Sequence, residues 1–282
     1  MCGEYLSPEI VPLLAGLGVL DGVTAANPHR LVALKLHFPR NSKTVRLPES
    51  AWGFSRYALD ALLLGRVADV RQERRAPAGG DVVATGRRAS NVPRGNREFG
   101  FKAHFRGPKT DTIELFFFDG CYTGVNGIED GLTNVCGLGP ESVLARYGFQ
   151  PDELIRAFPA LCERVAPLER VMDWHTTGPL AYVQRDSPER YLAGDALSFI
   201  DPFTGSGILS ALISGMSAGR SAALGEPPGK HYRRCERALR RPFLVSSLIR
   251  ASIRSGLADL ALPLVPGSWL VRWTRPRASV VD

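Results

Sequence analysis

Apolar and polar residues alternate along two stretches of the chain, which predicts two groups of antiparallel strands. In residues 99–139 the first run alternates aromatic and polar positions, and the last two runs are separated by turn residues at 129–131. Residues 31–48 alternate in the same way on both sides of a Pro-Arg-Asn sequence at 39–41. Alternation with a period of two places one face of each strand against a core. We therefore expect a meander in 99–139 and a hairpin in 31–48.

Apolar residues at helical spacing predict helices in most of the remaining chain. Ser7 and Ser55 each precede such a pattern and are the expected N-caps. From residue 230 onward the chain reads as basic helices, the first over 232–241 and the second from Pro242 onward. The other predicted helices cover residues 140–147 and 151–165.

Residues 191–219 combine a short buried strand, a glycine-rich turn and a helix made largely of small residues. Gly194 and Asp195 end the strand, and the helix begins near Ser206. Such a combination makes an anion-binding concavity, because free N–H groups and the helix dipole point at one spot. An aspartate at the strand end can accept hydrogen bonds from ligand hydroxyls. The stretch therefore predicts a ligand site, and an ordinary strand–turn–helix is the alternative.

This stretch resembles the second flavin-contacting motif of FAD-dependent oxidoreductases, a Gly-Asp-Ala…Asp-Pro-Phe-x-Gly-x-Gly pattern that here spans residues 194–207. The match is closest to the geranylgeranyl-reductase-like and aromatic-hydroxylase-like branch. Three shorter motifs of the same family also match: Cys2-Gly3-Glu4, the helix start at Ser55-Arg56, and a strand that runs into Thr85-Gly86.

The resemblance implies a bound FAD, with NAD(P)H as electron donor, and gives roles to the matching residues. The helix near Ser206 would direct its N–H groups at the flavin ring, and Asp195 would bind hydroxyls of the ribityl chain. Arg56 would lie against the cofactor, where a nearby anion offsets the cost of a cation at a helix N-terminus. No catalytic side chain and no metal site is assigned. The implied cofactor-binding residues are Cys2, Gly3, Arg56, Thr85, Gly86, Gly194, Asp195, Pro202, Gly205, Ser206 and Gly207.

The family places a strand, a G-x-G-x-x-G turn and a helix before its Cys-Gly motif, and this sequence contains no such unit. Gly205-Ser206-Gly207 is the nearest string, but it lacks the third glycine, and the Asp-Pro-Phe motif already explains it. The expected fold class is α/β (α+β mixed): an incomplete FAD/NAD(P)-binding Rossmann-like domain, an antiparallel substrate-binding sheet and a helical C-terminal region. The expected domains are 1–96 with 171–225 for the flavin, 97–139 for the sheet with a helical connection over 140–170, and 226–282 for the basic helices.

The amino-acid composition indicates the class of protein and the cellular compartment. The 282 residues are 44% hydrophobic and 22% charged, which is typical of a globular protein. Five cysteines without CxxC spacing argue against a disulfide framework or a zinc site and indicate a reducing, cytoplasmic location. The sequence shows neither a signal peptide nor an apolar run long enough to span a membrane.

The formal net charge of +7 is concentrated near the C-terminus. Residues 229–277 hold eleven Lys and Arg residues against two acidic residues. A basic segment of this kind suits nucleic acid, a membrane surface or an anionic ligand. No nucleic-acid-binding motif is present, so we expect no nucleic-acid partner. Peripheral membrane contact, a cover over an apolar substrate channel and ordinary helix packing all stay open.

Two functions are compatible with these features. The first is an FAD-dependent oxidoreductase, of reductase or monooxygenase type, that acts on an apolar isoprenoid-, lipid- or polyketide-like small molecule. The alternative is a truncated or degenerate relative without independent catalysis, either a binding protein that keeps the apolar pocket or a gene-model fragment. Retention of flavin separates the two, because a site without the glycine-rich loop lacks several hydrogen bonds to phosphate.

Overall fold

The computed structural model describes residues 2–72, 81–86, 97–180, 187, 189–198 and 202–267. Within this part of the chain, nine strands form one large sheet. Its β2–β6 pair is parallel and its other pairs are antiparallel. Across the sheet the strands are β1 (Tyr5–Leu6), β3 (Ser42–Gly53), β2 (His29–His37), β6 (Thr112–Phe118), β7 (Cys121–Gly127), β8 (Leu132–Pro140), β5 (Glu98–Arg106) and β10 (His175–Leu180), and β9 (Glu169–Arg170) pairs with β5.

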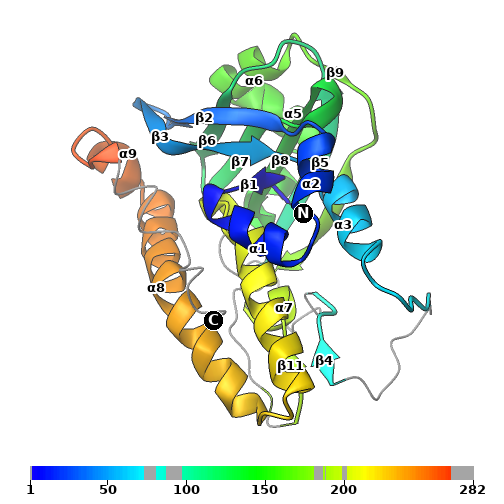
Figure 1. Cartoon of the computed structure of the whole chain (residues 1–282). Helices are drawn as coiled ribbons and strands as arrows, with labels where there is room; N and C mark the ends of the chain where they lie inside the picture. The colour runs from blue at the N-terminus through cyan, green and yellow to red at the C-terminus, as the bar shows by residue number, and fades with distance from the viewer. Residues whose placement is uncertain are drawn as a thin grey trace.

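The two faces of the large sheet pack against different helices (Figure 1). On one face, Phe101 and Phe116 lie in a core that also contains residues of three short helices. On the opposite face, Leu36 and Phe117 lie in a cluster with residues of the C-terminal helices. This division follows from the alternation of side chains along each strand. The helices of the first face are α4 (Glu141–Arg146), α5 (Pro151–Ala157) and α6 (Pro159–Val165), and those of the second are α8 (Pro228–Arg254) and α9 (Leu257–Ala261).

A third cluster joins the N-terminal segment to the start of helix α7 (Gly207–Ala223). Leu6, Ile10 and Phe54 are fully buried in it, and Ile208 of α7 packs into the same cluster. This contact holds the first residues of the chain beside the first turn of α7. The helices that contribute are η1 (Pro8–Ile10), α1 (Val11–Gly16), α2 (Leu20–Ala25) and α3 (Arg56–Leu64).

A separate two-stranded parallel sheet lies alongside α7 (Figure 1). It pairs β4 (Val82–Val83) with β11 (Tyr191–Leu192), and two short helical turns, η3 (Gly194–Ala196) and η4 (Pro202–Thr204), follow β11. Helix α8 is tied to this sheet, because Nε2 of the buried His231 lies 2.8 Å from the carbonyl oxygen of Leu192. The Tyr232 hydroxyl also donates to the carbonyl oxygen of Arg190.

The fold class predicted from the sequence is confirmed: the chain is mixed α/β, with a largely antiparallel sheet and a helical C-terminal region. The hairpin of β2 and β3 forms, and the meander expected over 99–139 forms in β6, β7 and β8. Its first strand, β5, pairs with β8 and not with β6, so this part of the prediction is wrong. Ser55 caps α3, since its Oγ accepts a hydrogen bond from the Ala58 N–H at 3.1 Å. The helix expected near Ser206 begins at Gly207.

Three further expectations are wrong in detail. The antiparallel sheet is larger than residues 97–139, because β1, β2 and β3 join it. Helix α8 runs unbroken through Pro242, whose side chain is buried, although a proline within a helix removes a backbone hydrogen bond. Ser7 stands at the N-cap of η1 as predicted, but its side chain makes no capping hydrogen bond, and its buried Oγ has no partner within the described part of the chain. The domain boundaries stay a prediction, and residues 268–282 of the last predicted segment lie outside the described residues.

Candidate functional site

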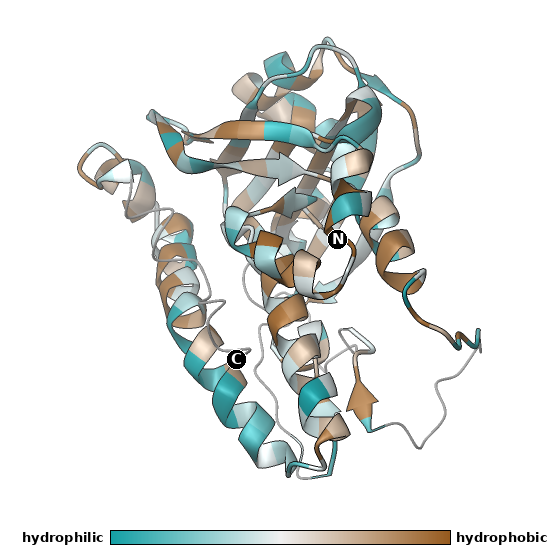
Figure 2. Cartoon of the chain, viewed as in Figure 1, coloured by the Kyte–Doolittle hydropathy of each residue, from teal (hydrophilic) through white to brown (hydrophobic). Residues whose placement is uncertain are grey.

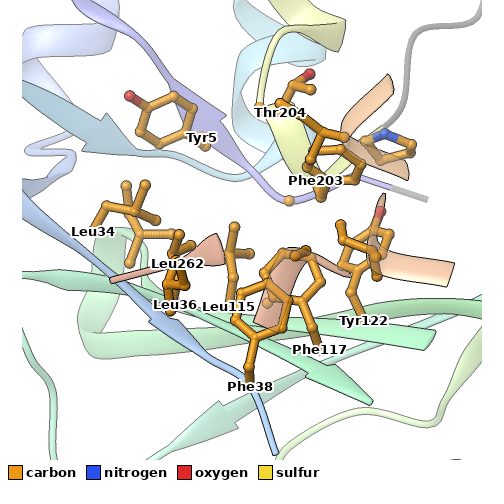
Figure 3. Close-up of a pocket in the computed structure, with 18 of the residues that line it drawn as sticks. Tyr5, Leu34, Leu36, Phe38, Leu115, Phe117, Tyr122, Phe203, Thr204 and Leu262 are labelled. Atoms are coloured by element: carbon orange, nitrogen blue, oxygen red, sulfur yellow. The ribbon is translucent and has the colours of Figure 1, made fainter. Parts of the chain in front are cut away.

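An apolar cavity of about 350 Å³ lies between the large sheet and the C-terminal helices. Figure 3 shows its floor, where side chains from β2, β6 and β7 point to the same space. The roof comes from the inner faces of α8 and α9 and the residues after them, including Ile249, Ile253 and Leu262. The floor residues are Leu34, Leu36, Phe38, Leu115, Phe117 and Tyr122.

The turn that leads into α7 closes one side of the cavity (Figure 3). The ring of Phe203 meets Phe117 edge-on at 6.0 Å between centroids and Tyr122 at 5.9 Å. Gly205 has a φ of +65°, a conformation that glycine adopts without strain, and this lets the chain turn from η4 into the helix. Pro202 and Gly205 both line the cavity, as the sequence motif predicts for residues beside a ligand. Asp201 of that motif lies outside the described residues.

The N-terminal segment supplies another side of the same cavity. Cys2 and Gly3 line it, although they stand some 200 positions before Pro202 in the sequence. Burial raises the pKa of the Cys2 thiol, so this group stays protonated near neutral pH and is no thiolate nucleophile. The structure therefore brings four predicted site residues to one cavity: Cys2, Gly3, Pro202 and Gly205.

The first turn of α7 begins directly after these cavity residues. The N–H groups in the first turn of a helix have no partner within that helix, and the dipole adds partial positive charge there. Ser206 is buried, whereas Gly207 is exposed. A Cβ added to Gly207 would meet no atom within 4 Å. The N-terminus of this 17-residue helix is therefore sterically open at Gly207.

Four further predicted residues gather at the edge of the two-stranded sheet. Thr85 and Gly86 follow β4, and Gly194 and Asp195 follow β11. Because the two strands are parallel, their carboxyl ends meet at one edge, which is where ligands bind in open α/β sheets. The Gly194 N–H donates to Oγ of Ser214 at 2.9 Å, which fixes this edge against α7.

Comparisons with known proteins point to one fold. No protein-family model and no curated protein sequence matches the chain. Among solved structures, the flavoprotein/dehydrogenase from Cytophaga hutchinsonii superposes with a TM-score of 0.75 at 16% identity, over 100% of this chain and 83% of that chain. The flavin-dependent brominase Bmp2 gives a TM-score of 0.70 at 16% identity, over 100% of this chain and 85% of that one. PqsL from P. aeruginosa, solved in complex with 2-aminobenzoylacetate, gives 0.63 at 15% identity, over 99% and 88%.

This chain has the FAD-binding flavoprotein fold. The residues present fit a flavin, on two observations of this structure. A Cβ added to Gly86, like one added to Gly207, would meet no atom within 4 Å, so both turns leave room for a ligand. The buried Oγ of Ser198, shortly after the Gly194-Asp195 turn, has no hydrogen-bond partner among the described residues, so it can serve a ligand polar atom.

Arg56 lies close to the thiol of Cys2, another predicted flavin-site residue. Its guanidinium donates to both carboxylate oxygens of Asp60 at 2.9 Å and remains half-exposed. The N-terminus of α3 is satisfied by the protein itself, since the Arg56 N–H donates to Glu4 and the Ser55 N–H donates to Glu129, at 2.9 and 2.8 Å. The anion expected at this helix start is thus supplied by the chain's own carboxylates. A contact between Arg56 and the cofactor stays a prediction.

Sequence reasoning missed a buried ionic cluster in this flavoprotein fold. The Glu4 carboxylate, 1% exposed, accepts hydrogen bonds from Lys102 and, at 2.7 Å, from Nε2 of His104. Glu4 has a φ of +53°, a strained value for a residue with a side chain, and such strain often accompanies function. A signal was present in β5, where Lys102 and His104 occupy the polar positions of the alternation. These two side chains face the N-terminal segment, where they meet Glu4.

Proposed function

We propose that this chain is an FAD-dependent oxidoreductase of monooxygenase or reductase type that acts on an apolar small molecule. The observation that supports this proposal is that the apolar cavity lies next to the N-terminus of α7. The 202–205 turn lines the apolar cavity and leads directly into the N-terminus of α7, which is sterically open at Gly207 and stabilises negative charge in front of it. A substrate in the cavity would therefore lie beside a group held at the helix start.

Bound FAD would supply the redox chemistry, because side chains have no hydride or oxygen chemistry of their own. Thr85, Gly86, Gly194 and Asp195 would hold its ribityl and phosphate portion, and Gly205, Ser206 and Gly207 its ring, with Cys2 and Gly3 opposite. The first-turn N–H groups of α7 favour negative charge at the ring edge that they face. Pro202 and Phe203, which line the cavity, would lie against the ring. We further propose NAD(P)H as the source of electrons.

The proposed substrate is isoprenoid-, lipid- or polyketide-like, as the cavity lining suggests. Six floor side chains are apolar or aromatic, and the roof is largely aliphatic. Transfer of hydrocarbon from water into such a lining is favourable by about 0.8 kcal/mol per CH₂. Polar side chains are fewer than apolar ones in the lining, and they would orient a polar group of the substrate: Tyr5, Tyr122, Asn126, Thr204 and Ser252.

Flavin binding tests the proposal through two matched glycines. Gly207 and Gly219 are both exposed helical positions at which a Cβ would meet no atom within 4 Å. Gly207→Leu places a side chain where the flavin is expected and should weaken FAD binding about tenfold or more, a change of about 1.4 kcal/mol. Gly219→Leu, three turns further along α7, should leave it unchanged. The measurement is the Kd for FAD from flavin absorbance or fluorescence after reconstitution.

A wild-type chain that takes up no flavin, or equal FAD affinities of Gly207→Leu and Gly219→Leu, would contradict this proposal. In the first case the second candidate function stands, a binding protein for apolar molecules. The observation that favours this binding function is that side chains of the protein form the floor, the roof and the other described sides of the cavity, so no cofactor is needed to complete them.

Cavity binding is a separate prediction that holds for both functions. Ala258 lines the cavity from α9, whereas Ala251 is exposed on α8 and does not line it. Ala258→Trp should fill much of the space and weaken binding of a fluorescent fatty-acid probe about tenfold or more. Ala251→Trp should bind the probe like the wild type. Unchanged probe affinity in Ala258→Trp would show that the cavity is not the binding site.

A further inference from the structure

The outer face of α8 and α9 carries a group of exposed leucines. Single exposed apolar residues are common on protein surfaces, but several together mark an interaction surface. These leucines fall within the last three turns of α8, in α9 and just beyond it. The residues and their exposed fractions are Leu244 (52%), Leu248 (71%), Leu257 (60%), Leu260 (58%) and Leu264 (85%).

The same face of α8 is basic toward its N-terminus. Arg233, Arg237, Arg240 and Leu244 follow at intervals of three and four residues, so they share one side of the helix. The three arginines are exposed, and no salt bridge within the described part of the chain involves them. The arginine of the buried flank, Arg234, is paired with Glu226. Figure 2 shows the hydrophilic first half of α8 and the more hydrophobic region around α9.

The inner face of these two helices is the roof of the cavity. Val245, Ile249 and Ala258 line the cavity, and each directly follows an exposed leucine in the sequence. Leu257, the leucine before Ala258, is exposed and also lines the cavity. The leucine face and the apolar interior therefore lie on the same thin layer of helix and meet at Leu257. Among the described residues, no helix is both long and apolar enough to cross a bilayer, so a contact of this face with lipid would be interfacial.

We propose that the outer face of α8 and α9 docks onto an anionic lipid surface, with its leucines in the acyl boundary and its arginines on the headgroups. Charge complementarity favours this occupant. A basic stripe attracts a phosphate-rich surface, whereas a second copy of this chain, also of net charge +7, would set arginines against arginines. The docked face places the cavity roof at the bilayer, from which an apolar substrate can enter. This last step rests on the proposed function, and docking itself does not.

Flotation of the full chain with lipid vesicles tests the proposal. The wild type should float with vesicles of phosphatidylcholine and phosphatidylserine, and less so with phosphatidylcholine alone or at high salt. Leu248→Gln with Leu260→Gln should reduce partitioning about tenfold. Tyr57→Gln, a change at an 88% exposed aromatic residue on α3, is the matched control and should have no effect.

A second pair of variants tests the contribution of the arginines in the first half of α8. Arg237→Gln with Arg240→Gln should abolish the preference for phosphatidylserine, while Arg156→Gln on α5, on the other side of the large sheet, should keep it. Absence of vesicle binding by the wild type would overturn the proposal. So would binding that ignores phosphatidylserine and salt, or leucine variants that change only the oligomeric state, which would assign the face to a second copy. FAD content, measured on the same samples, tests the proposed function separately.

Discussion

Glu4→Gln is expected to lower the free energy of unfolding by about 3–5 kcal/mol. The carboxylate is buried, and it accepts hydrogen bonds from Lys102, from His104 and from the N–H of Arg56. Removal of its charge leaves the Lys102 ammonium, 13% exposed, without its counter-ion in a region of low dielectric. The change is measured by urea unfolding of the two proteins, followed by circular dichroism.

A double-mutant cycle shows whether this loss comes from the unpaired charge. Lys102→Met removes the cation and keeps much of the side-chain volume. The double variant should be more stable than the sum of the two single effects predicts, by about 0.5–3 kcal/mol, because neither partner is then left alone. Strictly additive effects would show that Glu4 contributes through its shape and not through its charge.

The same cluster gives a dependence on pH. Burial alone would raise the pKa of the Glu4 carboxyl. The hydrogen bond from His104 and the charge of Lys102 lower this pKa by more than burial raises it, so it lies below its ordinary value. The unfolded chain then binds more protons than the folded chain near the ordinary value of about 4.3. The contribution of Glu4 is complete above that pH and disappears as the pH falls through the folded-state pKa. The stability difference between wild type and Glu4→Gln should shrink accordingly.

Gly53→Ala is the second change with a large expected effect, a loss of about 3 kcal/mol or more. A Cβ at Gly53 would lie 1.8 Å from the carbonyl oxygen of Gly127 and 2.9 Å from its carbonyl carbon. Both are backbone atoms, so the strands themselves must move, and overpacking that shifts backbone lies at the upper end of the usual cost of about 1–3 kcal/mol. Gly53 also pairs with Tyr5 in β1, so the segment with Cys2 and Gly3 would move with it.

Gly219→Ala is the matched control, because its Cβ meets no atom within 4 Å. It should be neutral or stabilise the protein by up to about 1 kcal/mol, since alanine favours the helix and reduces the freedom of the unfolded chain. Thermal unfolding of both variants and the wild type gives the comparison. A Gly53→Ala protein as stable as the wild type would mean that β3 and β7 are not in contact at this point.

Local patterns predicted much of this fold, because alternation, caps and turns act between residues close in sequence. The meander around 129–131, the cap at Ser55 and the start of α7 all follow from such patterns. The parallel pairing of β2 with β6 does not, since it joins residues 79 positions apart. Nor did the sequence reveal that α8 continues through Pro242, because this depends on what the buried side of the helix packs against.

The candidate site divides in the same way. Its motifs could be located in the sequence, and the parallel pairing of β4 and β11 places Thr85-Gly86 and Gly194-Asp195 at one edge. The ionic cluster could not be located, because Glu4 meets Lys102 and His104 across 98 and 100 positions. The sequence left open whether the C-terminal helices cover an apolar channel, because the spacing of their apolar residues does not show what they pack against; in the structure Ile249 and Ile253 line the cavity.

The attachment of α8 at both ends has a consequence for how the site can vary. Its first turns are bonded to β11 through His231 and Tyr232, and its last turns roof the cavity. With 27 residues, the helix spans about 40 Å at 1.5 Å per residue. The length of this one helix therefore sets the distance between the sheet edge that carries Asp195 and the cavity. An insertion or deletion within α8 would shift the cavity roof relative to the sheet edge that carries Asp195. We therefore expect substrate range to change through side chains of the roof and not through the length of α8.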